Sequence, residues 1–262
     1  MNSIGFEEKF TAFLNSLRIE NGHSFIELDK KKELAYLESE RFRFKNTFQS
    51  ITSAKPIKIL DIGTTPFTLF IKECYPDYVV STLDLTHLME ERCIAKGIQF
   101  KTCNLETEPI PFEDGSFDIV ILTEVLEHLF IPPRLVIGEC RRVIRSGGKL
   151  IFSVPNLARL IKRVKLFVGI SPLDDPEDQM KRGWVHGRGH IREYTMKEVT
   201  SMLKASGFTI SKKRFLQPGL LDVIRGPNSK GILNIALAAY YLVGLGVPSF
   251  RRVVTINCYK TG

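Results

Sequence analysis

Short apolar runs alternate with amphipathic segments through the middle of the chain. Between residues 56 and 155 the runs follow one another as the strands of a parallel α/β sheet do, with a helical pattern between successive strands. Val120-Ile121-Leu122 is continuously apolar, as expected for a strand covered on both faces. We therefore expect strands at Ile57–Ile62, Val79–Asp84, Ile98–Cys103, Phe117–Leu122 and Gly148–Val154, and helices near 66–75, 86–96 and 132–144.

The two flanking regions have other patterns. Residues 6–50 repeat apolar positions at helical spacing, with a break near Asn21-Gly22. We expect residues 1–55 to form an N-terminal helical cap and residues 56–262 the main domain, with an insertion at about 156–193 that could cover a site. After Pro155 the pattern predicts a basic amphipathic helix at Leu157–Val168, a loop at 169–193, a helix at Thr195–Ala205, a strand at Phe208–Arg214, an apolar helix at 232–243 and a strand at Arg252–Tyr259.

Composition indicates a folded protein of a reducing compartment. The 262 residues are 44% hydrophobic and 25% charged, which excludes a disordered chain. The five cysteines form no CxxC pair and no zinc spacing, and the first ten residues lack the apolar run of a signal peptide. The apolar stretch 232–247 is interrupted and shorter than the ~20 residues of a membrane span. We expect a cytoplasmic location.

Charge is unevenly distributed along the sequence. The net charge is +8, but residues 56–155 carry a net −4 and residues 156–262, with 18 basic and 7 acidic groups, a net +11. An acidic middle suits a ligand with hydroxyl groups or positive charge. A basic final third suits an anionic partner, although a solvated basic face would have the same composition.

The first turn of the expected sheet has the features of a ligand site. Asp61 and Gly63 follow an apolar strand, Thr65 is a suitable N-cap, and Pro66 suits a first helical position. Ligands bind at the carboxyl ends of the strands in such a sheet, and the free N–H groups of the following helix can bind an anion. Asp84 ends the second strand, where an acid can bind ribose hydroxyls.

Six segments in order resemble the class I S-adenosylmethionine-dependent methyltransferases, in the type 11/12-like group with an EVLEH sequence: ILDIG, STLDL, CNLE, PFEDGSFDIVILTEVLEHL, ECRRVIRSGGKLIFSVPN and GHIREYTMKEVTSMLKASGF. The resemblance covers about 56–215. It implies a Rossmann-like seven-stranded sheet of order 3-2-1-4-5-7-6 with helices on both faces. It also implies S-adenosylmethionine as cofactor, bound through Asp61, Gly63, Thr65, Asp84, Leu85, Asn104, Leu105, Thr123 and Glu124, the last two beside the methyl group.

The first turn departs from the family pattern of alternate glycines, because Thr65 and Phe67 stand where glycine is usual. The Thr65 hydroxyl could bind the cofactor carboxylate instead. The departure leaves a non-catalytic protein with a methyltransferase fold as an alternative. It also argues against a nicotinamide dehydrogenase, which needs a glycine-rich turn for the pyrophosphate.

The expected chemistry is transfer of a methyl group to a positioned nucleophile. His128 and His190 are the candidate general bases, and Trp184, His186 and Tyr194 could line an acceptor pocket. Glu124, Glu127 and His128 would share one face if helical. With His190 they resemble the metal site of ubiquinone-pathway O-methyltransferases and small-RNA 2′-O-methyltransferases. Such mixed ligands suit Mn²⁺, Fe²⁺ or Zn²⁺ better than Mg²⁺.

These features predict O-methylation of a sugar, a glycan intermediate or another small hydroxylated acceptor that is anionic or lipid-linked, as in polysaccharide biosynthesis. The basic helix 157–168 could lie on the inner face of a membrane as a peripheral contact. An RNA 2′-O-methyltransferase is an alternative. The single tryptophan offers little for base stacking, so nucleic acid is the less favoured partner.

Overall fold

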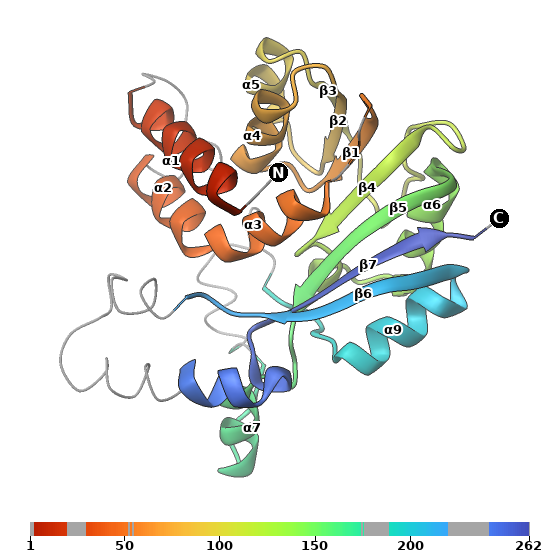
Figure 1. The fold of residues 1–262 in the computed structure, drawn as a ribbon. Coiled ribbons are helices and arrows are strands. Elements are labelled where there is room, and N and C mark those ends of the chain that lie inside the picture. Colours follow the sequence, from red (N-terminus) through yellow and green to blue (C-terminus); the bar gives the residue numbers. More distant parts are fainter. Residues whose placement is uncertain are drawn as a thin grey trace.

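The computed structural model describes residues 3–19, 30–51, 53, 55–173, 175, 189–219 and 241–261. Seven strands form one sheet in the order β3-β2-β1-β4-β5-β7-β6, which confirms the expected fold class and strand order (Figure 1). Strands β1 to β5 pair in parallel, and β7 lies antiparallel between β5 and β6. The strands are β1 Lys58–Ile62, β2 Val79–Asp84, β3 Gln99–Thr102, β4 Phe117–Thr123, β5 Ile144–Pro155, β6 Phe208–Leu216 and β7 Val253–Lys260.

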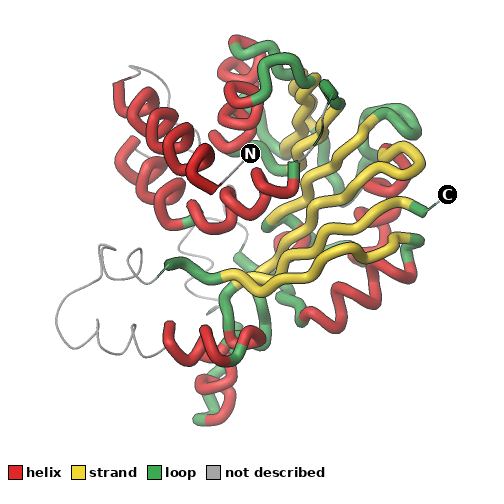
Figure 2. Tube along the Cα trace, in the orientation of Figure 1, coloured by secondary structure: helices red, strands yellow, loops and turns green. Residues whose placement is uncertain are grey.

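Helices cover both faces of the sheet (Figure 2). One face carries α1 Ser3–Ile19, α2 Lys30–Ser39, α3 Arg41–Ser50, α4 Pro66–Cys74 and α5 Glu90–Ala95. The other carries α6 Pro133–Val143 and α9 Met196–Ala205. The remaining described helical segments are α7 Leu160–Phe167, residues 241–246, and the short turns η1 Leu126–His128 and η2 Pro248–Phe250.

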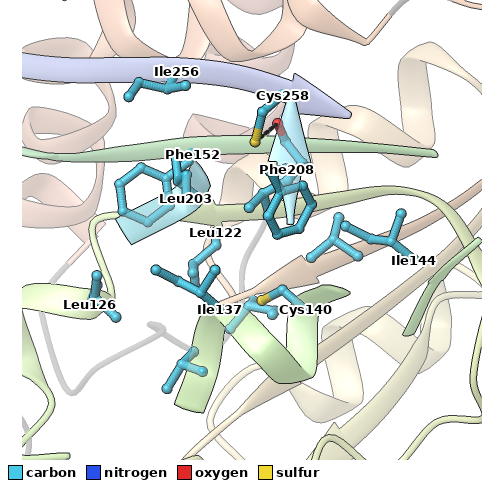
Figure 3. Close-up of a cluster of buried hydrophobic side chains, with 14 of the residues drawn as sticks. Leu122, Leu126, Ile137, Cys140, Ile144, Phe152, Leu203, Phe208, Ile256 and Cys258 are labelled. Atoms are coloured by element: carbon cyan, nitrogen blue, oxygen red, sulfur yellow. Dashed lines mark hydrogen bonds between the residues drawn. The ribbon is translucent and has the colours of Figure 1, made fainter. Parts of the chain in front are cut away.

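The strand alternation divides the interior into two cores. Successive side chains of a strand point to opposite faces, so the continuous apolar runs supply both cores at once. The core beside α1–α5 receives Ile59, Ile119, Ile121 and Ile151. The core beside α6 and α9 receives Leu60, Val120, Leu122, Leu150 and Phe152, and Figure 3 shows part of it.

The N-terminal helices share the first core with the sheet. Phe44 of α3 stacks on Phe67 of α4 with ring centroids 4.6 Å apart, and Phe10 meets Phe70 edge-on at 5.1 Å. Aromatic pairs of this geometry add stability beyond the apolar area they bury. Residues 3–19 and 30–51 therefore pack against α4 as part of the first core.

Three helical regions differ from the expected boundaries. The helix expected at Leu157–Val168 begins only at Leu160, because the Asn156 side chain accepts from the N–H of Ala158 and holds a turn before it. The helix expected near 86–96 spans only Glu90–Ala95, because the backbone N–H of Thr86 donates to Asp84 and holds a turn there. The helical region 30–50 has a further break at Glu40, whose side chain binds Arg43 and Arg252. The expected break at Asn21-Gly22 and most of the expected helix 232–243 lie outside the described residues.

Candidate active site

A cavity of about 300 Å³ opens at the carboxyl ends of β1, β2 and β4. Parallel α/β sheets bind their ligands at this edge. The N-terminal helices contribute Tyr36, Arg43 and Phe44 to its wall. The other lining residues are Asp61, Gly63, Thr64, Thr65, Phe67, Asp84, Thr123, Glu124 and Val125. The structure thus brings together most of the residues expected to bind the cofactor.

Two of the glycines that are usual in the turn after β1 are absent here, and hydrogen bonds of side chains hold the turn instead. Gly63 has φ +83°, and a Cβ there would lie 2.8 Å from Cγ2 of Val125, so this one glycine is required. Thr65 caps α4: its Oγ1 accepts from the N–H of Phe67 at 3.3 Å. The N–H of Thr65 donates in return to Oγ1 of Thr68 at 3.2 Å. This capping box confirms the expected helix start and leaves the Thr65 hydroxyl hydrogen available to a ligand.

Asp61 is buried beneath this turn. Its carboxylate accepts from the Thr68 hydroxyl at 2.7 Å. Burial raises the pKa of Asp61 to about 7, although the Thr68 hydrogen bond and the charge of Arg43 act in the opposite direction. A carboxyl that titrates near neutrality inside a cavity is a feature of functional sites.

Asp84 connects the ends of β1 and β2. One carboxylate oxygen accepts from the N–H of Thr64 at 2.9 Å, and the other from the N–H of Thr86 at 3.1 Å. Burial raises the pKa of Asp84, against these N–H donors. Oδ1 also accepts from the Thr86 hydroxyl at 3.4 Å, whereas Oδ2, which accepts from the N–H of Thr64, can take a second hydrogen bond, so Asp84 fixes the turn and can still bind a ligand hydroxyl through Oδ2.

Arg43 is a cavity residue that the sequence reasoning missed. Its guanidinium is buried and donates to Glu40 at 3.2 Å, to the Tyr36 hydroxyl at 2.9 Å and to Thr123 Oγ1 at 3.3 Å. Burial would lower the pKa of Arg43, but its neighbours raise it, so it stays a cation. The one feature of the sequence that could have indicated Arg43 is its position on a helix that buries phenylalanines.

Glu124 directly follows β4 and has a strained backbone conformation. It has φ +56°, the one positive value among the described non-glycine residues. Its carboxylate accepts from the Ser153 hydroxyl at 2.9 Å, and its N–H donates to the Ser153 carbonyl at 3.0 Å. Burial raises the pKa of Glu124, while Arg43 lowers it. Strain of this kind often accompanies function.

The expected helical face of Glu124, Glu127 and His128 is wrong. The left-handed Glu124 cannot belong to a right-handed turn, and the 3-10 turn begins only at Leu126. Glu124 therefore lines the cavity, while Glu127 and His128 form a group with His190 in which one ligand atom from each lies within 4.8 Å of the others.

The remaining expected cofactor residues lie outside the residues that line the cavity. Leu85, next to Asp84, is about half exposed. Asn104 binds the backbone N–H of Glu106 through its side chain, and Leu105 packs beside the second core. They follow β2 and β3, at the same edge of the sheet as the cavity.

Backbone hydrogen bonds bring His190 to Glu127 and His128. The carbonyl of Glu127 accepts from the N–H groups of Ile191 at 2.8 Å and Arg192 at 3.3 Å. The rings of His128 and His190 then meet edge to face with centroids 5.1 Å apart. This contact joins residues more than sixty positions apart in the sequence.

Glu127 is a buried acid without a hydrogen-bond donor among the described residues. Its side chain is fully buried, and neither carboxylate oxygen has a partner there. Nε2 of His128 lies 3.8 Å from Oε1 of Glu127. Burial, reinforced by the charge of Glu124, raises the pKa of Glu127 well above its usual range. A buried carboxylate without a partner is costly, so this position is suited to a cation or a proton.

Glu193 holds the cluster of Glu127, His128 and His190 through a hydrogen bond to His190. It is buried and accepts from Nδ1 of His190 at 2.7 Å, and its carboxylate lies 2.6 Å from the Lys162 ammonium of α7. Burial would raise the pKa of Glu193, but His190 and Lys162 lower it, so it is ionised. An ionised acceptor at Nδ1 leaves the lone pair of His190 on Nε2. Neither Glu193 nor Lys162 was expected from the sequence.

Of the three expected acceptor residues, the structure describes Tyr194. Trp184 and His186 lie outside the described residues. Tyr194 is 2% exposed and belongs to the second core, where its carbonyl accepts from the N–H of Leu157. Its buried position differs from the expectation that its ring lines an acceptor pocket.

The middle of the chain is similar to known methyltransferase domains. A family model described as a methyltransferase domain matches residues 60–152. A protein of Mycobacterium tuberculosis named "Probable S-adenosylmethionine-dependent methyltransferase" is 33% identical over 125 residues, which cover 48% of this chain and 38% of that protein. The malonyl-[acyl-carrier protein] O-methyltransferase of Geobacter sulfurreducens is 28% identical over 105 residues, 38% of this chain and 39% of that protein. The chain thus spans about two fifths of these relatives.

Solved structures share the fold over nearly the whole chain. The complex between the Haloferax volcanii Trm112 methyltransferase activator and a methyltransferase matches with a TM-score of 0.60 at 14% identity, over 97% of this chain and 98% of that one. N-methyltransferase NodS from Bradyrhizobium japonicum, in complex with S-adenosyl-L-homocysteine, matches with a TM-score of 0.54 at 15% identity, over 95% and 99%. From the strand order and these matches, the chain has the fold of the class I S-adenosylmethionine-dependent methyltransferases, and its residues 60–152 are similar to a methyltransferase domain.

Proposed function

We propose that this protein transfers the methyl group of S-adenosylmethionine to a hydroxyl of a sugar, a glycan intermediate or another small acceptor. The observation that carries the proposal is the adjacency of two groups of residues. The cavity at Asp61, Asp84 and Glu124 and the cluster at Glu127, His128 and His190 are joined by one short segment, residues 123–128.

The cavity residues fit the cofactor in charge and in shape. S-adenosylmethionine combines ribose hydroxyls, a carboxylate and a cationic sulfonium. Asp84 has acceptor capacity for hydroxyls, and the buried Arg43 supplies a positive charge to the same cavity. Asp61 and Glu124 face the same cavity, and a bound cation would favour the ionised form of both carboxyls, whose pKa values burial raises. Because Gly63 has no Cβ, its backbone can lie close to Val125 at the wall of the cavity.

The His190–Glu193 pair supports transfer to oxygen. Methyl transfer breaks the bond from sulfur to the methyl carbon and forms one from the acceptor oxygen, while sulfur keeps the electron pair. The acceptor hydroxyl must lose its proton. Nε2 of His190 can take that proton, because Glu193 holds Nδ1 and stabilises the charged ring.

A separate observation favours a divalent cation at the same cluster. Glu127 is buried without a hydrogen-bond donor among the described residues, next to two imidazoles. Two nitrogen ligands and one carboxylate suit Mn²⁺, Fe²⁺ or Zn²⁺. A bound divalent cation lowers the pKa of a nearby hydroxyl, and His190, oriented by Glu193, would then serve as a ligand rather than as the base.

The nature of the acceptor is inferred from charge and not from relatives. The names of similar proteins cover O-methylation of a malonyl carrier, C-methylation in ubiquinone/menaquinone biosynthesis and an N-methyltransferase, so the fold serves several nucleophiles. The strongly basic residues 156–262 favour an anionic or lipid-linked acceptor. RNA 2′-O-methylation remains the second candidate, because the histidine and carboxylate cluster would serve it equally.

Calorimetry with S-adenosylmethionine tests the proposal. Asp84→Asn should weaken binding by about tenfold or more, since a hydrogen bond to a charged group is lost. Asp77→Asn is the control, because Asp77 is exposed and precedes β2 at the opposite end of the strand. Absence of binding to the unaltered protein at millimolar cofactor would contradict both enzyme proposals. Incorporation of labelled methyl groups into glycan or RNA fractions then separates the two acceptor classes.

A further inference from the structure

The helix α7 presents apolar side chains to solvent. Figure 1 shows it projecting below the sheet. Phe167 is 91% exposed, and Ile161 and Val164 are each nearly half exposed. The exposed apolar residues continue past its end through Val168, Ile170 and Leu173. Exposed apolar surface of this extent on one short segment indicates a partner.

The helix α7 directs the charged side chain of Lys162 toward the protein and its apolar face toward solvent. Lys162 is the one buried side chain of α7, held by Glu193 at 2.6 Å. At about 100° per residue, Val164 and Phe167 lie at about 160° and 140° from Lys162 around the helix axis. The apolar face therefore points away from the body of the protein. A helix covering a core would have the opposite orientation.

A second segment extends the apolar surface. Residues 241–247 expose Leu242, Val243, Leu245 and Val247. They continue into η2, which contacts the α7 region: the Arg163 guanidinium lies 4.9 Å from the centre of the Phe250 ring, and the Asn156 side chain donates to the Ser249 carbonyl at 2.8 Å. We name the exposed apolar residues of 161–173 and 242–247 the apolar ridge.

Basic side chains border the apolar ridge. Lys165 and Arg163 are both exposed and lie on either side of the face formed by Ile161, Val164 and Phe167. An apolar face bordered by basic residues is typical of helices that lie in the interface of an anionic membrane. A symmetric dimer through this ridge would bring the same basic residues of two copies together, which is unfavourable.

We propose that the apolar ridge docks on an anionic lipid bilayer, with α7 in the plane of the interface. None of the described helices is long and apolar enough to cross a membrane, so the contact would be peripheral. The proposal does not depend on methyltransferase activity. The charge complementarity of Arg163 and Lys165 with lipid phosphates supports it.

Co-sedimentation with vesicles tests the docking surface. The protein should bind vesicles of phosphatidylcholine with phosphatidylglycerol and bind phosphatidylcholine alone at least several-fold less. Val164→Ser with Phe167→Ser should reduce the binding more than tenfold, because two large apolar side chains no longer enter the bilayer. Ile94→Ser on α5 is the matched control, since Ile94 is also exposed but lies outside the ridge.

Three results would overturn the proposal. They are no binding of the unaltered protein to anionic vesicles, unchanged binding of the double variant, and an equal loss in Ile94→Ser. Sedimentation equilibrium tests whether a second copy of the chain occupies the ridge instead. A dimer of the unaltered protein that is lost in the double variant, together with no binding to vesicles, would assign the ridge to a second copy. The thermal unfolding midpoint of each variant should stay near that of the unaltered protein, because the substituted side chains are exposed.

Discussion

The guanidinium of Arg43 on α3 donates a hydrogen bond to Oγ1 of Thr123 at the end of β4, 80 positions further along the chain. The contact joins the N-terminal helices to the strand that ends beside the cavity. The helical cap therefore lines the candidate site through Tyr36, Arg43 and Phe44, and Arg43 brings a positive charge to it.

Arg43 is expected to contribute to cofactor affinity. Arg43→Gln removes the cation that faces the cavity, and binding of S-adenosylmethionine should weaken by about tenfold, measured by calorimetry. Arg43→Lys should keep part of the affinity. Arg41→Gln is the control, since Arg41 lies on the same helix but pairs with Glu7 and Glu38. A folded Arg43→Gln protein with unaltered affinity would rule out this role.

Asp61 is expected to make stability depend on pH. Its pKa is raised by burial to about 7, so ionisation between pH 4 and 7 is easier in the unfolded chain than in the folded one. This group therefore lowers the free energy of unfolding as pH rises through that window, by on the order of a few kcal/mol.

Asp61→Asn should remove this contribution. Denaturant unfolding at pH 4 and at pH 7 should show the variant gaining stability relative to the unaltered protein at the higher pH. Asparagine can still accept from the Thr68 hydroxyl. An equal difference at both pH values would show that Asp61 titrates normally in the fold.

Thr68 is expected to stabilise the first turn. Thr68→Val removes the hydroxyl that donates to Asp61 and that accepts from the N–H of Thr65, so the free energy of unfolding should fall by about 1–3 kcal/mol. The matched control is Thr200→Val, whose buried hydroxyl has no hydrogen-bond partner among the described residues. This control should be neutral or slightly stabilising. Equal losses in both variants would mean that the Thr68 hydrogen bonds contribute nothing specific.

Removal of metal ions is expected to show whether His190 acts as a metal ligand or as the general base. If the cluster holds a cation, Mn²⁺ should bind the protein in calorimetry after chelation, and Glu127→Gln and His190→Gln should each weaken that binding by at least tenfold. His87→Gln is the control, because His87 is an exposed histidine that pairs only with its neighbours Glu90 and Thr102 in the described chain. Undiminished methyl transfer in the presence of chelator would favour His190 as the general base.

Much of the fold could be predicted because each strand repeats one simple pattern. Val120-Ile121-Leu122 predicts a strand buried on both faces, and the two cores divide these residues between them. Strand order came from the family resemblance and not from the apolar pattern itself. Helix boundaries were less predictable where a side chain competes with the backbone, as Asp84 does by accepting from the N–H of Thr86.

The site residues at strand ends could be predicted from the sequence, and those that other elements contribute could not. Asp61 and Asp84 lie at the carboxyl ends of β1 and β2, and Glu124 follows β4, so their meeting at one edge follows from topology. Arg43 reaches the cavity from a helix, and a pattern of phenylalanines gives no reason to single it out. Glu124 shows a further limit: its positive φ separates it from Glu127, and spacing alone predicts the opposite.

The position of β7 has a consequence for how the chain is made. This strand contains nearly the last residues of the sequence, yet it lies between β5 and β6. During synthesis the edge of β5 stays without its neighbour until residue 253 and its successors have left the ribosome. Arg252, just before β7, also pairs with Glu40, which in turn holds Arg43. The cavity wall is therefore completed only after Arg252 and β7 have been made, and a nascent chain exposes an apolar strand edge until that moment.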